Sequence, residues 1–252
     1  MFRDRESAGL EALYGIHAVR EAIGLRPVDY VLVAQGHHGP RVDEIIHACR
    51  AQGVPVRFAP RPALDRMAGV RQHQDVLAVC AAKGYDDLES LTLTSRHPPL
   101  LVILDGVEDP ANLGAVIRTA VAAGANGVVI PERRAAGLSS AVARSAAGAL
   151  EHLKVARVTN LARALMEIKK QETWVYGFEP GGGKSYLDFD YSLRCALVLG
   201  GEGHGLRRLV RESCDAVGQI PLYGPVQSLN VSVAAAVVLY EAARQRHGKP
   251  EG

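Results

Sequence analysis

The chain has 252 residues, enough for one large domain or two small ones. Apolar residues make up 48% and charged residues 22%, a mixture that excludes a disordered chain and allows a sizeable core. The net charge of +2 permits nucleic acid as a partner without requiring it, although Arg outnumbers Lys by 23 to 6.

The cysteines and the N-terminal residues indicate the compartment. None of Cys49, Cys80, Cys195 and Cys214 forms a Cys-x-x-Cys pair or has a His at ligand spacing, so we interpret them as buried, reduced thiols. The first residues carry acids and lack the apolar stretch of a signal peptide. No apolar run is long enough to cross a bilayer. We therefore expect a soluble cytoplasmic protein.

Short helices and strands alternate over the first 80 residues. We expect residues 1–10 to be frayed, and the later patterns predict helices over 14–23, 40–49 and 62–67 and strands over 30–34, 54–58 and 76–80. They make up a small α/β domain, 1–82. Residues 83–98 are polar and run into Pro98-Pro99, so they read as a linker, with a short helix near 88–93.

From residue 99 to 248 the alternation becomes regular. The run 100–104 is continuously apolar, as expected of a strand that is covered on both faces. Further strands are predicted over 128–130, 154–158, 174–176 and 196–199, and helices over 113–121, 139–150, 159–170, 206–212 and from 228 onward. Strands that alternate with helices indicate a parallel sheet in a layered α/β domain.

Three loops share one form, in which a strand leads through a turn rich in Gly or Pro into a helix. They span residues 105–118, 199–206 and 220–234. Ligands of open α/β sheets bind beyond the carboxyl ends of the strands, so the three loops can converge on one edge. Glycine-rich and proline-stiffened backbone suits a nucleoside-like cofactor that is held by N–H and C=O groups.

The polar side chains in these loops have structural as well as functional readings. Asn112 and Ser228 stand where helix caps are common, and Arg118 lies off the apolar face of its helix. Glu202 would repel a phosphate, so it suits a cation or hydroxyl donors better. The helix after Asn230 is apolar nearly all round, which predicts a buried helix.

Two other motifs are weaker. Residues 177–185 resemble a Walker A loop, but five residues separate the two glycines where four are needed, and no convincing helix follows. His37-His38 could suggest a metal, but no Cys or acid is placed to complete a site, so we expect no metal.

With its three loops, the sequence resembles the SpoU, or TrmH-type, branch of the SPOUT RNA methyltransferases. The resemblance is carried by 112–118, 199–206 and 220–234, in the family's order and spacing. Residues 14–19, His73-Gln74 and 145–152 resemble the group that methylates a guanosine 2′-hydroxyl in 23S rRNA. One position departs from that group, because Asp75 stands where a Gly is expected.

The resemblance implies a trefoil-knotted catalytic domain over 99–248, an RNA-binding domain over 1–82, a homodimer, and S-adenosyl-L-methionine as methyl donor. It implies that the donor lies against Gly200, Ile220 and Leu229. The positions that match the family's polar site residues, associated with catalysis or substrate placement, are Asn112, Arg118, Glu202, Ser228 and Asn230.

The reaction so implied is an in-line displacement, in which a ribose 2′-oxygen attacks a methyl carbon on a sulfonium, the carbon–sulfur bond breaks, and the hydroxyl proton leaves through a neighbouring oxygen or water. Because guanidinium stays protonated in proteins, our hypothesis is that Arg118 grips phosphate or stabilises a developing alkoxide. Glu202 could orient Asn or Arg side chains, or simply stabilise its loop. Candidates for RNA contact in the first domain, against the alternative of a solvated basic face, are Arg57, Arg61, Arg66, Arg71 and His73.

Three functions stay open from the sequence. The first is a 23S rRNA guanosine 2′-O-methyltransferase, which the N-terminal domain favours. The second is a methyltransferase that acts on tRNA or confers antibiotic resistance. The third is an RNA-binding protein with an inactive site, which the intact polar positions argue against.

Overall fold

The computed structural model describes residues 9–36, 39–93, 98–201 and 205–248. Contacts divide the chain into two units. The first comprises Met1–Gly84 with Leu138–His152, and the second comprises Tyr85–Gly137 with Leu153–Gly252. The first unit therefore contains a segment that is more than fifty residues distant in sequence.

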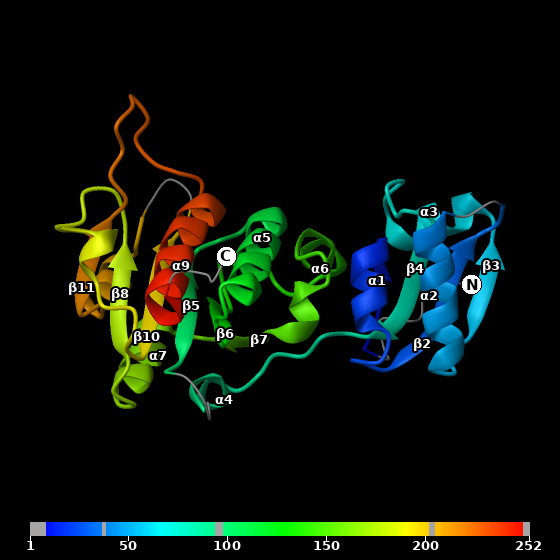
Figure 1. Ribbon diagram of the computed structural model, residues 1–252, viewed down its shortest axis with the longest axis horizontal. Coiled ribbons are helices and arrows are strands. Elements are labelled where there is room, and N and C mark those ends of the chain that lie inside the picture. Colours follow the sequence, from blue (N-terminus) through cyan, green and yellow to red (C-terminus); the bar gives the residue numbers. More distant parts are fainter. Residues whose placement is uncertain (1–8, 37–38, 94–97, 202–204, 249–252) are drawn as a thin grey trace. The chain divides into compact units, whose positions relative to one another are not determined.

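A four-stranded sheet forms the centre of the first unit (Figure 1). Its strands, in the order β1-β4-β2-β3, are β1 (Leu10–Tyr14), β4 (Val76–Ala81), β2 (Val28–Ala34) and β3 (Val56–Ala59). β4 is antiparallel to both of its neighbours, and β2 is parallel to β3. Alternate residues of β2 and β4, with Leu64, build an apolar core on one face.

The helices of the first unit come from two parts of the chain. α1 (Ile16–Ala22), α2 (Pro40–Ala51) and α3 (Arg61–Ala68) are local to it. α6 (Ser140–Ser145) and the 3-10 turn η2 (Ala149–His152) come from the distant segment and contact β1 and α1. The predicted helix over 139–150 is thus wrong beyond Ser145, because Ala147 and Gly148 adopt positive φ angles of 50° and 89°.

A buried ion pair holds this distant segment in the first unit. Arg26 donates to Glu11 at 2.5 Å and to Glu151 at 2.6 Å, and the side chains of Arg26 and Glu151 are almost wholly buried. Gly148 lies against α1, where a Cβ atom would overlap with the side chain of Glu21. The segment is therefore packed into the unit. It includes residues 145–152, which resemble the group that methylates 23S rRNA.

The second unit contains a parallel sheet, with seven strands among the described residues. Its order is β7-β6-β5-β10-β8-β11-β9, and each pair is parallel. The strands are β5 (Leu100–Asp105), β6 (Gly127–Pro131), β7 (Lys154–Val158), β8 (Trp174–Phe178), β9 (Lys184–Ser185), β10 (Cys195–Gly200) and β11 (Ala216–Gln219). The predicted α/β class, with a small N-terminal unit and a C-terminal parallel sheet, is confirmed.

Helices cover both faces of this sheet. Leu101 and Ile103 of β5 join a core with residues of α7 (Leu161–Lys169) and α8 (Arg208–Glu212) on one face. α5 (Pro110–Ala122) and α9 (Val231–His247) pack side by side and contact β6 and β10 (Figure 1). The short helices α4 (Leu88–Thr92), close to the predicted one, and η3 (Tyr186–Asp188) complete the unit.

Two further predictions at the level of single elements are wrong. The chain from Leu10 to Tyr14 is a strand, where a frayed end and a helix start were expected, because it pairs with the edge of β4. α9 is not buried all round, since Val233 is 49% exposed and Tyr240 57% exposed. Across the part of the chain that the structure describes, none of the helices is both long and apolar enough to span a membrane.

Candidate functional site

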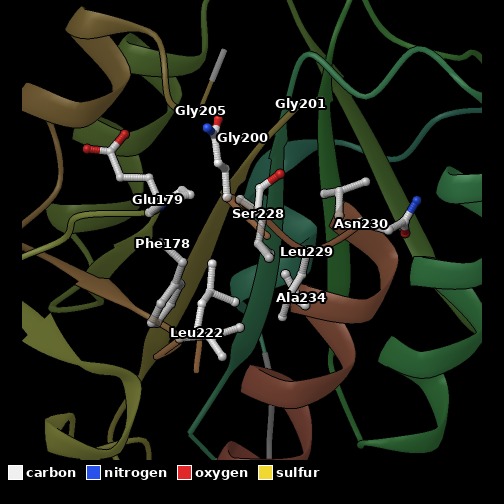
Figure 2. Close-up of a pocket in the computed structure, with 15 residues that line it drawn as sticks. Phe178, Glu179, Gly200, Gly201, Gly205, Leu222, Ser228, Leu229, Asn230 and Ala234 are labelled. Carbon is white, nitrogen blue, oxygen red and sulfur yellow. The ribbon is translucent and has the colours of Figure 1, made fainter. Parts of the chain in front are cut away.

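Two adjoining cavities open at the carboxyl ends of β5, β10 and β8, which are neighbours in the second unit's sheet. The first cavity, of about 600 Å³, has a wall of glycines, apolar side chains and some polar ones, with Phe178 and Glu179 on one side and Leu229 and Asn230 on the other (Figure 2). Its lining residues are Phe178, Glu179, Pro180, Leu199, Gly200, Gly201, Gly205, Ile220, Leu222, Gln227, Ser228, Leu229, Asn230, Val231 and Ala234.

Glycines make the wall of the first cavity possible. A Cβ atom on Gly200 would overlap with the backbone of Gly205, and one on Gly201 would overlap with the carbonyl of Gly106. The Gly201 N–H donates to the Asp105 carbonyl at 2.7 Å, which ties the β10 loop to the end of β5. The loop therefore presents bare backbone to the cavity, as a site built from N–H and C=O groups requires.

An asparagine pair connects the first predicted loop to the third. The Asn230 Nδ2 donates to the Asn112 Oδ1 at 3.0 Å, and Asn112 is buried in the first turn of α5. Asn230 also caps α9, because its Oδ1 accepts from the Ser232 N–H at 2.9 Å. The cap of α5 is Asp109, whose Oδ1 accepts from the Ala111 N–H.

The capping roles considered for Asn112 and Ser228 are therefore wrong. The N-cap of α5 is Asp109 and the N-cap of α9 is Asn230, so neither Asn112 nor Ser228 caps a helix. Ser228 is exposed and lines the first cavity (Figure 2).

The remaining predicted site residues differ in whether they line a cavity. Gly200, Ile220 and Leu229, the expected donor contacts, all line the first cavity. Arg118 lies exposed on α5 and lines neither cavity. Glu202 lies outside the described residues. The roles of all eight predicted residues stay predictions.

Glu179 was missed by the sequence analysis. It follows β8 directly, its Oε2 accepts from the Leu206 N–H at 3.3 Å, and its Oε1 accepts from Arg211 at 2.6 Å. Residue 179 was considered only as part of the rejected Walker A resemblance. Its position in the sequence could have identified it, because Glu179 is a charged residue shortly after a predicted strand, where ligands of parallel sheets bind.

The second cavity, of about 460 Å³, has a charged wall. It shares Gly201 and Gly205 with the first and is otherwise lined by Asp105, Gly106, Val107, Glu108, Asp109, Asn112, Arg134 and Arg207. The Asp105 carboxylate is fully buried and accepts from the Arg207 backbone N–H at 2.8 Å and from its Nε at 2.5 Å. Local sequence patterns do not predict this pair, because its members are 102 residues apart.

The cysteines of the second unit are unsuited to nucleophilic chemistry. Burial raises the pKa of the Cys195 thiol to about 11 and that of Cys214 to about 12, so both stay protonated at neutral pH. No group of three His, Cys, Asp or Glu side chains in the described ranges is arranged to hold a metal ion. His37 and His38 lie outside those ranges.

In the first unit, the predicted RNA contacts divide into two kinds. Arg57, Arg61, Arg66 and Arg71 are exposed. His73 is fully buried, its Nδ1 accepts from the Asp75 N–H at 3.1 Å, and its Nε2 lies 3.2 Å from Asp65. The proposed RNA contact of His73 is therefore wrong, because its side chain cannot reach a ligand.

Comparison with known proteins identifies the family. The model of the SpoU rRNA methylase family matches residues 99–240. The chain belongs to the SpoU rRNA methylase family. A second model, described as RNA 2′-O ribose methyltransferase substrate binding, matches residues 12–86.

Relatives of this family member cover nearly its whole length. It is 43% identical to a 23S rRNA (guanosine-2′-O-)-methyltransferase, RlmB, of Xanthomonas campestris, over 94% of this chain and 97% of that protein. It is 44% identical to a TrmH family tRNA/rRNA methyltransferase of Bacillus subtilis, named as putative, over 82% and 84%. The predicted family and RNA methyltransferase class are thus confirmed.

A solved structure supports the same assignment. The SpoU methyltransferase AviRb from Streptomyces viridochromogenes, in complex with the cofactor AdoMet, matches with a TM-score of 0.81 and 27% identity. The match covers 98% of this SpoU family chain and 94% of AviRb.

Proposed function

We propose that this protein transfers a methyl group from S-adenosyl-L-methionine to the ribose 2′-hydroxyl of a guanosine in 23S rRNA. The observation that carries the proposal is the pair of adjoining cavities, one with many glycines and apolar side chains and one with several charged side chains, joined by the Asn112–Asn230 hydrogen bond. The names of its full-length relatives support the choice of substrate. The protein would work in the cytoplasm, where ribosomes are assembled.

The first cavity fits such a donor in size and in chemistry. A volume of about 600 Å³ lies in the range of small-molecule sites, which are mostly apolar with a few polar groups. Leu199, Ile220 and Leu229 would enclose the adenine ring, and the backbone at Gly200 would meet its polar edge. When bound, S-adenosyl-L-methionine supplies an electrophilic methyl group on a sulfonium.

The chain's own residues would place the attacking hydroxyl. Ser228 and Asn230 line the first cavity and Asn112 lines the second, and the Asn112–Asn230 hydrogen bond connects the two walls, so these side chains can orient a ribose toward the first cavity. Much of the rate enhancement of such a displacement comes from holding two reactants in line. Arg118 lines neither cavity of its own chain, so of its two expected roles the grip on an RNA phosphate fits better than a contact with the alkoxide. An Arg118→Lys variant with full activity would contradict a forked guanidinium contact.

The first unit would bind the rRNA. Its exposed arginines support this role, and the substrate-binding model spans residues 12–86. We propose 1–82 as the RNA-binding domain, 83–98 as a linker and 99–248 as the catalytic domain. Residues 138–152 would then be a part of the catalytic segment that packs into the RNA-binding unit.

A homodimer and a trefoil knot complete the proposal. Val233 and Tyr240 of α9, together with Tyr223 and Val226, leave apolar side chains exposed, which suits an interface between two copies. Analytical ultracentrifugation should give a dimer, and Val233→Glu/Tyr240→Glu should give a monomer.

Glycine contacts between the β10 loop and the end of β5 support a tight backbone crossing of the kind that a knot needs.

Two measurements test the proposed activity. Calorimetry should detect binding of S-adenosyl-L-methionine to the purified protein, and mapping of 2′-O-methyl groups in a deletion strain should show one 23S rRNA guanosine that has lost its methyl group. A missing methyl group on tRNA would replace the rRNA assignment. Failure to bind the methyl donor would favour an RNA-binding protein without activity.

A further inference from the structure

The second cavity lies where the acceptor of a methyl transfer has to bind. It shares Gly201 and Gly205 with the first cavity, and its Asn112 is hydrogen-bonded to Asn230 on the wall of the first. Reacting atoms must come within about 3–3.5 Å of each other before transfer. A donor in the first cavity therefore requires its acceptor in an adjoining space, and the second cavity is such a space.

Arg207 is held in position for a ligand in this cavity. The Asp105 carboxylate is fully buried, whereas the Arg207 side chain is 44% exposed. Asp105 accepts from the backbone N–H and the Nε of Arg207 and also contacts its Nη2, so the guanidinium is fixed on one side and keeps its Nη1 donors for the cavity. A guanidinium fixed in this way suits a phosphate oxygen, and Arg134 adds a second positive charge to the wall.

The carboxylates on the same wall exclude a site for phosphate alone. Asp109 is engaged as the cap of α5, but the exposed Glu108 has no hydrogen-bond partner among the described residues. A carboxylate only accepts hydrogen bonds. Guanine presents two adjacent donors, N1–H and the N2 amino group, on its Watson–Crick edge, whereas adenine and cytosine have an acceptor at the equivalent ring nitrogen. Such edges are read in unpaired RNA.

We infer that the second cavity binds the target guanosine nucleotide, with the Glu108 carboxylate accepting from N1–H and the N2 amino group and the Arg207 guanidinium donating to the phosphate. This inference rests on the proposed function and names the residues that select the base. Asp105 acts as a positioning residue, because it orients Arg207 and does not itself reach the ligand.

The base contact is tested with a synthetic RNA that carries the mapped target guanosine, or inosine in its place, since inosine lacks the N2 amino group. For the wild-type protein, inosine should lower kcat/KM about 10-fold, the effect of losing a hydrogen bond to a charged group. Glu108→Gln should lower kcat/KM for guanosine RNA by a similar factor or more. With Glu108→Gln and inosine RNA together, the reduction of kcat/KM should be smaller than the product of the two separate reductions. A reduction equal to that product would overturn the base contact.

The phosphate contact is tested with Arg207→Lys, which keeps the positive charge beside the buried Asp105 and so preserves folding. Its RNA affinity, followed by fluorescence anisotropy, should fall about 10-fold, because the Lys ammonium lacks the separate N–H groups with which a guanidinium contacts Asp105 and the phosphate together. Arg208→Lys is the matched control, since the neighbouring Arg208 is exposed on α8 and pairs with Glu212. Glu132→Gln is the control for Glu108, and both controls should match the wild type.

Affinity for S-adenosyl-L-methionine, measured by calorimetry, separates the two levels of the proposal. It should be unchanged in Glu108→Gln and Arg207→Lys, because neither residue lines the first cavity. If the wild-type protein neither binds the donor nor methylates RNA, the proposed function fails. If it does both, and the Glu108 and Arg207 variants behave as their controls do, only the inference about the second cavity fails.

Discussion

At the scale of single residues, Asn230 combines a structural and a functional contact. Its Oδ1 caps α9, and its Nδ2 donates to Asn112. The substitution Asn230→Asp would keep the cap and lose the donor. Asn and Asp cap helices about equally well, and a negative charge is favourable at a helix N-terminus. The two contacts can therefore be separated by one substitution.

We expect Asn230→Asp to change the free energy of unfolding by less than about 1 kcal/mol. The rate of methyl transfer should fall at least about 10-fold, because a donor is replaced by a carboxylate beside the Asn112 oxygen. Urea unfolding and single-turnover methylation measure the two effects. Asn230→Ala, which loses both contacts, should also lower stability by about 1 kcal/mol. An Asn230→Asp protein with wild-type activity would show that the asparagine pair has no part in the reaction.

The buried thiols predict how stability depends on pH. Burial raises the pKa of Cys195 to about 11 from its ordinary value of 9.0. Between these values the unfolded chain has lost the proton that the folded chain keeps, so stability falls as pH rises above 9. At pH 10 this thiol should cost about 1 kcal/mol relative to pH 8. Urea unfolding of Cys195→Ala should show a loss between pH 8 and 10 that is smaller by that amount, and equal losses would contradict the burial effect.

At the scale of elements, the turn after β10 depends on glycine. A Cβ atom on Gly200 would overlap with Gly205, so Gly200→Ala must displace the loop that lines the first cavity. Calorimetry should show an affinity for S-adenosyl-L-methionine reduced at least about 10-fold, because overpacking shifts the backbone. Gly183→Ala is the control, since a Cβ atom there has no neighbour within 4 Å. If both variants bind the donor equally, the loop is not part of its site.

Arg26 makes the buried part of the attachment of residues 138–152 to the first unit, beside the more exposed Glu21–His152 and Arg144–Gln72 contacts. Removing one partner of a buried ion pair leaves an uncompensated charge, here the carboxylates of Glu11 and Glu151. We expect Arg26→Met to lower the free energy of unfolding by about 3 kcal/mol. Hydrogen exchange should show lost protection in 138–152. Arg208→Met, at the exposed Arg208–Glu212 ion pair, should cost less than about 1 kcal/mol, and a similar cost for both would contradict this assignment.

At the scale of the whole molecule, RNA binding by the first unit should be electrostatic. For single-stranded RNA, each phosphate contact adds about 0.7 to the slope of log affinity against log salt concentration. Arg66→Gln/Arg71→Gln should therefore lower this slope by about 1.4 if both residues contact phosphate. Filter binding at several salt concentrations measures it. Arg163→Gln, an exposed arginine of α7, should leave the slope unchanged, and an unchanged slope in the double variant would place the RNA elsewhere.

Local patterns predicted the larger part of the fold and of the candidate site. The apolar run 100–104 indicates a strand covered on both faces, and β5 is buried at each of its positions. The alternation of strands and helices after residue 99 indicates a parallel sheet, and the loops after β5, β10 and β11 bring Asn112, Gly200 and Asn230 together. These features depend on periodicity and on turns that are encoded within a few residues.

Only the tertiary structure decided the features whose partners are distant in sequence. The strand Leu10–Tyr14 exists because β4 offers an edge, and Arg26 finds Glu151 across 125 positions. Histidine is a residue type that often contacts ligands, but the His73 side chain is buried beside Asp65 and accepts from the backbone N–H of Asp75. Asp105 and Arg207 meet across 102 residues to give the second cavity its charge. A sequence specifies local conformation by short-range spacing, whereas burial and charge pairing depend on contacts that only the folded chain creates.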